Sequence, residues 1–270
     1  MSGLRSPAMH LDKYAAFVLD IDGVLVRDRV PLPGAVQAVK ALAEQGAVVL
    51  LTNNSTRERE TVAERLAALG FPVSPEQIVT SAFVAAHLLR QRYGPLRVWP
   101  VGEAGLLREI AAEGHTICDP SEAQWVVAGM DRQLTYSKLS DTLQALISGA
   151  RFLATNRDAT FPMETGQVPG AGAVIGAIEG MGFSPELVVG KPSDTAFRAA
   201  LELARVEPEQ ALMVGDRPET DIAGASAAGM DTALVLTGVA DRQKAQAQSI
   251  RPTWIADDLA ALAVGEAARG

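Results

Sequence analysis

The 270-residue sequence contains a single cysteine, Cys118, and little that would bind a polyanion or cross a bilayer. One cysteine excludes a disulfide within the chain and a cysteine-cluster metal site, and it fits a reducing compartment. The 24 basic residues are outnumbered by 32 acidic ones, giving a net charge of -8, which disfavours nucleic acid and anionic membranes as partners. No apolar run approaches the roughly 20 residues of a membrane-spanning helix, and the N-terminus lacks a signal-peptide core. These absences predict a cytoplasmic protein that binds neither nucleic acid nor membrane.

The composition, with 48% hydrophobic and 21% charged residues, is that of a globular protein long enough for two domains. Short apolar runs rich in Val and Leu recur along the chain, each followed by a segment with helical spacing. The runs are 15–20, 47–53, 187–191, 211–216 and 232–236. Such runs are too short for buried helices and are typical of strands covered on both faces. We therefore expect an α/β fold with a doubly wound, Rossmann-like parallel sheet.

Helix ends are marked at several places. Ser55 and Glu58 have the spacing of a capping box, which predicts a helix from there to Gly70. Further helices are predicted over 34–45 and 192–205 from their apolar spacing.

A second alternating set of strands and helices lies in the middle of the chain. Residues 81–187 contain predicted strands near Trp99, Trp125 and Phe152 with helices between them. This set lies between two strands of the outer set, which predicts an inserted α/β cap domain. The core domain would then comprise residues 1–80 and 188–270.

Polar residues follow the outer strands, at the edge where parallel sheets place their ligands. Asp20 and Asp22 leave one strand together and can reach one shared cation. A carboxylate such as Asp20 can attack phosphorus and form an aspartyl-phosphate, while Asp22 would donate and accept the proton. Gly23 would let the backbone turn sharply beside the phosphate.

The other strand ends offer groups that would bind a phosphate or a cation. The hydroxyl of Thr52 and the amides of Thr52, Asn53 and Asn54 can donate hydrogen bonds to phosphate oxygens. Lys191 supplies a positive charge that offsets repulsion between Asp20 and a phosphate dianion. Asp216 is a further oxygen ligand, and Asp221 can orient Lys191 or bind the metal through water. Oxygen ligands without His or Cys select Mg²⁺.

Each pattern alone is often only a turn, a helix cap or a strand exit. Together, however, DIDGVL (20–25), LLTNNS (50–55), GKP (190–192) and GDRPETDI (215–222) resemble the four motifs of the haloacid dehalogenase superfamily. The insert resembles the large α/β cap of its subclass IIA, the nitrophenylphosphatase-like branch. That branch includes phosphatases for phosphoglycolate, glycerol phosphate, pyridoxal phosphate and nucleoside monophosphates.

The resemblance implies roles for individual residues. Asp20 would be the nucleophile and Asp22 the acid/base, with Mg²⁺ held by Asp20, the Asp22 carbonyl and Asp216. Phosphate would be bound by Thr52, Asn53 and Lys191, and Asp221 matches the second acidic position of the fourth motif.

The segment 155–158 of the insert resembles the substrate-facing loop of such caps. It makes Asn156, Arg157 and Asp158 candidate substrate-binding residues, with Arg157 the candidate for substrate selection. An exposed loop arginine or an ion pair with Asp158 is an equally good interpretation of Arg157.

Three rival functions differ in what they require. A dehalogenase has no use for Asp22 as a leaving-group acid. A phosphomutase would pass the phosphoryl group to a second sugar hydroxyl, and a non-catalytic binding or regulatory module would not need Asp20 and Asp22 together. The expected function is therefore hydrolysis of a small phosphorylated metabolite, and the resemblance allows a homodimer.

Overall fold

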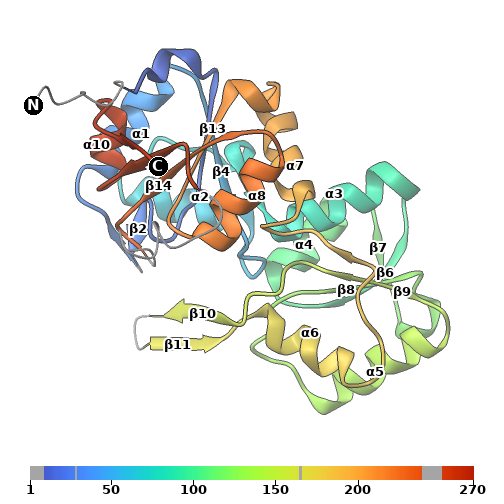
Figure 1. Cartoon of the computed structure of the whole chain (residues 1–270). Helices are drawn as coiled ribbons and strands as arrows, with labels where there is room; N and C mark the ends of the chain where they lie inside the picture. The colour runs from blue at the N-terminus through green and yellow to red at the C-terminus, as the bar shows by residue number, and fades with distance from the viewer. Residues whose placement is uncertain (1–8, 28, 164–165, 239–250) are drawn as a thin grey trace, which may run out of the picture. The chain divides into compact units, whose positions relative to one another are not determined.

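The computed structural model describes residues 9–27, 29–163, 166–238 and 251–270 (Figure 1). The chain forms two compact units, and each is described by itself. The first comprises Met1–Thr52, Ala63–Ile78 and Phe197–Gly270, and the second comprises Asn53–Val62 and Val79–Ala196. The division differs from the predicted one in that 53–62, 79–80 and 188–196 group with the inserted segment.

The first unit is built on a seven-stranded sheet with the strand order β16-β15-β14-β13-β1-β4-β5, and the division between the units falls within the last of these strands. The strands are β1 (Ala16–Leu19), β4 (Ala47–Thr52), β5 (Ile78–Thr80), β13 (Ala211–Gly215), β14 (Asp231–Val235), β15 (Trp254–Ala256) and β16 (Ala268–Arg269). Strand β1 pairs in parallel with β13 and β4, and β14 pairs in parallel with β13 and β15. Strands β1 and β13 are buried along their whole length, which explains their unbroken apolar sequences.

Helices cover this sheet. They are α1 (Ala35–Ala43), α2 (Arg59–Ala68), α7 (Asp194–Ala204), α8 (Ala223–Ala227) and α10 (Leu259–Ala263), with single turns η1 (Leu11–Lys13), η2 (Pro75–Gln77), η4 (Pro208–Gln210) and η5 (Pro218–Ile222). A short hairpin, β2 (Val26–Arg27) and β3 (Val30–Pro31), follows β1. Figure 1 shows α1 and α10 side by side on one side of β13 and β14, with α8 on the other. The doubly wound α/β fold is therefore confirmed.

The second unit has its own parallel sheet, with the strand order β12-β9-β8-β6-β7. Its strands are β6 (Arg97–Val101), β7 (Thr116–Ile117), β8 (Trp125–Ala128), β9 (Arg151–Ala154) and β12 (Leu187–Val188). The remaining elements are α3 (Ser81–Tyr93), α4 (Ala104–Ala112), η3 (Pro120–Glu122), α5 (Tyr136–Ile147), α6 (Ala171–Glu179) and the hairpin of β10 (Thr160–Met163) and β11 (Gly166–Pro169). Side chains of β8, β9, α5 and α6 form its apolar core.

Two local predictions were wrong. The strand before Lys191 was expected in the core sheet, but β12 has two residues and pairs with β9 in the second sheet. The helix expected from Ser55 begins at Arg59 instead. The reason is that Asn54 accepts hydrogen bonds from the N–H and hydroxyl of Thr56, and this local turn competes with a helix start.

The predicted end of that helix is correct. Gly70 follows it with a φ of 94°, a left-handed conformation that favours glycine. Within the described residues, no helix combines the length and the apolar character needed to cross a bilayer.

Candidate active site

The two central strands of the first unit bring Asp20 and Asp216 together. Asp20 directly follows β1, and Asp216 directly follows the neighbouring parallel strand β13. The N–H of Asp20 donates to the Val214 carbonyl at 2.9 Å, so strand pairing continues to the first acidic residue. Because parallel strands end at the same edge, both carboxylates lie at the carboxyl edge of the sheet.

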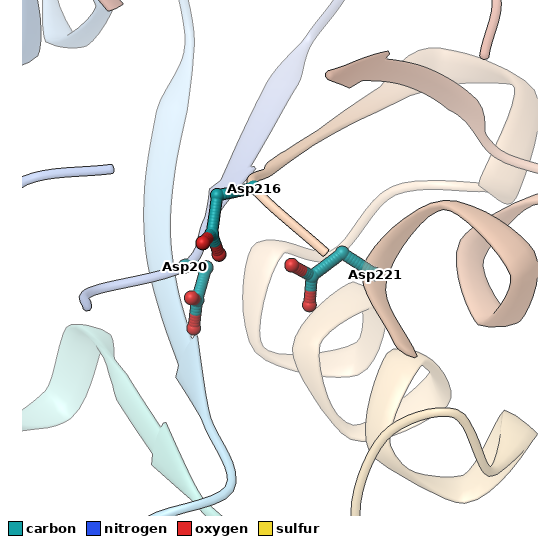
Figure 2. A group of neighbouring side chains, drawn as sticks. All are labelled: Asp20, Asp216 and Asp221. Carbon is teal, nitrogen blue, oxygen red and sulfur yellow. The ribbon is translucent and has the colours of Figure 1, made fainter. Parts of the chain in front are cut away.

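Asp221 completes a group of three buried carboxylates (Figure 2). Each of Asp20, Asp216 and Asp221 places a carboxylate oxygen within 4.8 Å of the other two. Their exposed fractions are only 7%, 2% and 0%. Asp221 comes from η5, where its Oδ2 also accepts a hydrogen bond from the N–H of Arg217 at 3.1 Å.

This donor set fits a divalent cation. Buried carboxylates so close together repel one another strongly, and burying charge without compensation is costly. A hard cation offsets that repulsion, and three carboxylates without His or Cys are the ligands that Mg²⁺ and Ca²⁺ prefer. The predicted metal set was Asp20, Asp22 and Asp216, with Asp221 in support. In the structure Asp221 belongs to the group, with an oxygen within 4.8 Å of one from each of Asp20 and Asp216.

Glycines leave the space that these carboxylates occupy. A Cβ on Gly23 would lie 2.6 Å from Oδ2 of Asp216, and one on Gly238 would also collide with that carboxylate. A Cβ on Gly215 would collide with Asp221. The acidic group therefore depends on small residues at three separate places in the chain.

Asp22 lies in the turn between β1 and β2 and is half-buried. The turn is closed by hydrogen bonds from the N–H groups of Leu25 and Val26 to the Ile21 carbonyl. Gly23 takes a φ of 86°, and its carbonyl accepts from the hydroxyl of Thr237 at 2.6 Å. Thr237 thus supports the turn, and nothing in its sequence context pointed to that role. The acid/base role of Asp22 stays a prediction.

Thr52 is the last residue of β4 and is buried, whereas Asn53 and Asn54 begin the second unit. The side chain of Asn54 is engaged by Thr56, as described above. In the second unit, Asn53 contacts two predicted site residues, Asp158 and Lys191.

The predicted substrate loop and Lys191 also meet in the second unit. The Asn156 side chain donates to the Asn53 carbonyl at 2.8 Å, and the N–H of Asp158 donates to Oδ1 of Asn156 at 3.0 Å. Lys191 is buried, with a 5% exposed fraction. One hydrogen-bonded group therefore contains four predicted site residues from three separate segments of the chain, namely Asn53, Asn156, Asp158 and Lys191.

Arg157 has a partner that the sequence did not suggest. Its guanidinium donates to the Glu179 carboxylate at 3.1 and 2.7 Å, not to Asp158. These hydrogen bonds raise the pKa of Arg157 above its ordinary value and lower that of Glu179. Arg157 remains half exposed at the surface of its unit.

Comparisons with known proteins identify the family. Residues 17–116 match the family model described as haloacid dehalogenase-like hydrolase, and residues 188–262 match one described as HAD-hydrolase-like. The fold, the acidic group and these matches define a hydrolase of the haloacid dehalogenase class.

The similar proteins described next are all named as phosphatases. An acid sugar phosphatase of Staphylococcus saprophyticus is 33% identical, over 92% of this chain and 96% of its own. A p-nitrophenyl phosphatase from Archaeoglobus fulgidus superposes with a TM-score of 0.88 at 34% identity, over 93% of this chain and 98% of its own. A glycerol phosphate phosphatase from Mycobacterium tuberculosis, in complex with magnesium, superposes with a TM-score of 0.88 at 35% identity, over 96% of this chain and 79% of its own.

The chain therefore belongs to the haloacid dehalogenase-like hydrolases, in their nitrophenylphosphatase-like branch of phosphatases, which confirms the resemblance seen in the sequence.

Proposed function

We propose that this phosphatase hydrolyses small phosphomonoesters with Mg²⁺, through an aspartyl-phosphate formed on Asp20. The observation that carries the proposal is the buried group of Asp20, Asp216 and Asp221, whose oxygens lie within 4.8 Å of one another. It sets a carboxylate nucleophile beside ligands for a hard cation. Bound Mg²⁺ would offset the charge of the phosphate and orient it toward Asp20.

The residues of the chain would act in two displacements. In the first, a carboxylate oxygen of Asp20 forms a bond to phosphorus while the ester P–O bond breaks, and Asp22 gives its proton to the leaving alkoxide. In the second, Asp22 takes a proton from water as that water attacks phosphorus, which releases inorganic phosphate and restores Asp20. The charge of Lys191 and the hydroxyl of Thr52 would hold the phosphate in line.

The inserted segment 81–187 would act as the cap of this site, and its loop 155–158 would select the substrate. The relatives are named an acid sugar phosphatase, a p-nitrophenyl phosphatase and a glycerol phosphate phosphatase. We propose this range of small esters, together with phosphoglycolate, pyridoxal phosphate and nucleoside monophosphates, as the panel in which the substrate will be found.

The test is release of inorganic phosphate from p-nitrophenyl phosphate by the purified chain. Activity should disappear with a chelator and return with Mg²⁺. Asp216→Asn should need a higher Mg²⁺ concentration for half-maximal activity, because it removes one anionic ligand. Full activity in the chelator would contradict the metal site. A sugar phosphate that is isomerised without release of inorganic phosphate would show a phosphomutase instead.

A further inference from the structure

Asn53 uses both N–H donors and the carbonyl oxygen of its side chain within the second unit. Its Nδ2 donates to both carboxylate oxygens of Asp158, at 3.3 and 3.1 Å, and to the Lys191 carbonyl at 3.0 Å. Its Oδ1 accepts from the N–H of Lys191 at 2.7 Å. A side-chain amide has two N–H donors and one carbonyl, and all are engaged. A bond from this amide to a phosphate oxygen would require one of these contacts to break.

Asn53 forms hydrogen bonds with both backbone polar groups of Lys191. Asn53 pairs with the N–H and the carbonyl of the same residue, much as a neighbouring strand would, so it fixes the backbone that carries the lysine. The preceding residue, Gly190, donates its N–H to the Thr155 carbonyl at 2.6 Å. A Cβ on Gly190 would lie 2.6 Å from Oδ1 of Asn53, so glycine is what allows this close approach.

The loop 156–158 is held on two sides. Asn156 and the hydroxyl of Ser81 both donate to the Asn53 carbonyl, at 2.8 and 2.6 Å. On the other side, the N–H of Gly172 at the start of α6 donates to the Asp158 carbonyl at 2.9 Å. A Cβ on Gly172 would lie 2.8 Å from the Arg157 carbonyl, so the helix start packs closely against the loop.

We propose that Asn53 is a positioning residue, whose side chain fastens Lys191 to the loop 156–158 instead of binding the substrate phosphate. The loop that meets the variable part of the substrate and the lysine that meets its phosphate are then held as one assembly. A displacement of the loop therefore also displaces Lys191, because Asn53 is hydrogen-bonded to both Asp158 and Lys191. The inference rests on the proposed function, in which Lys191 offsets the phosphate charge.

A double-mutant cycle separates positioning from direct binding. The variants are Asn53→Ala, Asp158→Ala and their combination, with kcat and KM measured on p-nitrophenyl phosphate at saturating Mg²⁺. Each single change should lower kcat/KM between about tenfold and a hundredfold, because Lys191 is displaced but present. The kcat/KM of the double variant should lie within about twofold of that of the less active single variant, because both changes break the same chain of contacts. Losses that multiply would show that Asn53 and Asp158 act independently, and would overturn the inference.

Two further variants distinguish positioning from general instability. Asp158→Asn keeps one acceptor for Nδ2 of Asn53, so it should lose less activity than Asp158→Ala. Glu186→Ala breaks an exposed ion pair with Arg151 elsewhere in the same unit and should leave kcat/KM unchanged. Equal losses in Asp158→Asn and Asp158→Ala, or an equal loss in Glu186→Ala, would contradict the inference. This comparison also carries the test if Asn53→Ala does not fold.

Hydrogen exchange gives a readout that needs no catalysis. The amide N–H of Lys191 is protected by Asn53, so its exchange should quicken in Asn53→Ala and, less strongly, in Asp158→Ala. A wild-type chain without phosphatase activity would refute the proposed function while leaving this structural test intact. An active wild type whose Asn53→Ala variant exchanges faster at Lys191 but keeps its kcat/KM would refute the inference alone.

Discussion

Asp20 and Asp216 follow neighbouring parallel strands, and their carboxylate oxygens lie within 4.8 Å of each other in a buried group that Asp221 completes. The sheet brings together residues that are far apart in the sequence, because β1 lies directly beside β13. Repulsion within such a group makes it a poor structural element on its own. Its place at the carboxyl edge of the sheet fits the proposed role, in which it would bind a cation beside the nucleophile.

Asp20→Asn should abolish hydrolysis. The amide has nearly the same shape as the carboxylate but cannot attack phosphorus, so kcat should fall roughly a thousandfold or more. Circular dichroism should show an unchanged fold. Asp119→Asn, at an exposed carboxylate of the second unit, is the matched control and should keep wild-type kcat. An Asp20→Asn variant with appreciable turnover would remove Asp20 from the role of nucleophile.

Gly23→Ala should weaken metal-dependent activity. The new methyl group would lie 2.6 Å from Oδ2 of Asp216, and alanine is strained at a φ of 86°. Moving Asp216 should raise the Mg²⁺ concentration for half-maximal activity and lower kcat. The strain itself should cost about 1 kcal/mol of the free energy of unfolding.

Gly94→Ala is the control for that strain. Gly94 has a φ of 73°, and a Cβ there meets nothing within 4 Å. It should lose similar stability while keeping the Mg²⁺ response and kcat of the wild type. If both glycine variants lose activity alike, the contact between Gly23 and Asp216 is not the cause.

The sequence could predict the core site because it is built on strand ends. Buried parallel strands have unbroken apolar sequences, and the acidic residues stand where those sequences stop, as at Asp20 and Asp216. The general rule that ligands bind at the carboxyl edge of a parallel sheet then predicts from the sequence that both residues lie at one site. Asp221 was harder to place, because its position depends on the single turn η5.

The other features depend on contacts that leave no local pattern. Strand β12 was expected in the core sheet, and only its pairing with β9 shows the sheet to which it belongs. The bond from Asn53 to Asp158 joins residues 105 positions apart. The pairing of Arg157 with Glu179 depends on how the loop lies against α6. Periodicity and motif spacing carry no information on such pairs.

Arg157→Ala should change which substrates are preferred. A guanidinium favours carboxylates, so the ratio of kcat/KM for phosphoglycolate to that for glycerol phosphate should fall roughly tenfold. The ion pair with Glu179 is half exposed, so thermal stability should change little. Both kinetic constants should be measured at the same Mg²⁺ concentration.

Glu179→Gln tests whether the ion pair alone explains the effect. It weakens the partner but leaves the charge of Arg157, so the substrate ratio should stay at or above that of the wild type. If Glu179→Gln and Arg157→Ala lower the ratio equally, Arg157 acts through loop structure and does not meet the substrate.

Asp231→Asn should destabilise the first unit in a pH-dependent way. Burial raises the pKa of Asp231, but hydrogen bonds from Lys13 at 2.6 Å and Tyr14 at 2.7 Å outweigh burial and lower it below 3.8. A carboxylate whose pKa falls on folding adds stability above its unfolded pKa, and this stability is lost as pH drops through the folded value. The variant should therefore be less stable than the wild type at pH 7 and pH 5, by about 1 kcal/mol. The difference should shrink below the unfolded value of 3.8.

Urea unfolding at several pH values measures that difference, and the partner variant Lys13→Gln identifies its source. The pKa of Lys13 is raised above 10.5: burial alone would lower it, but the hydrogen bonds to Asp231 and Tyr14 prevail. Stability from the lysine should therefore persist at neutral pH and fade only as pH rises above 10.5. In the Lys13→Gln background, Asp231→Asn should cost less at pH 7, because the two groups share one contact. If the loss of unfolding free energy in Asp231→Asn stays constant down to pH 2.5, packing of the side chain, rather than its charge, stabilises this part of the fold.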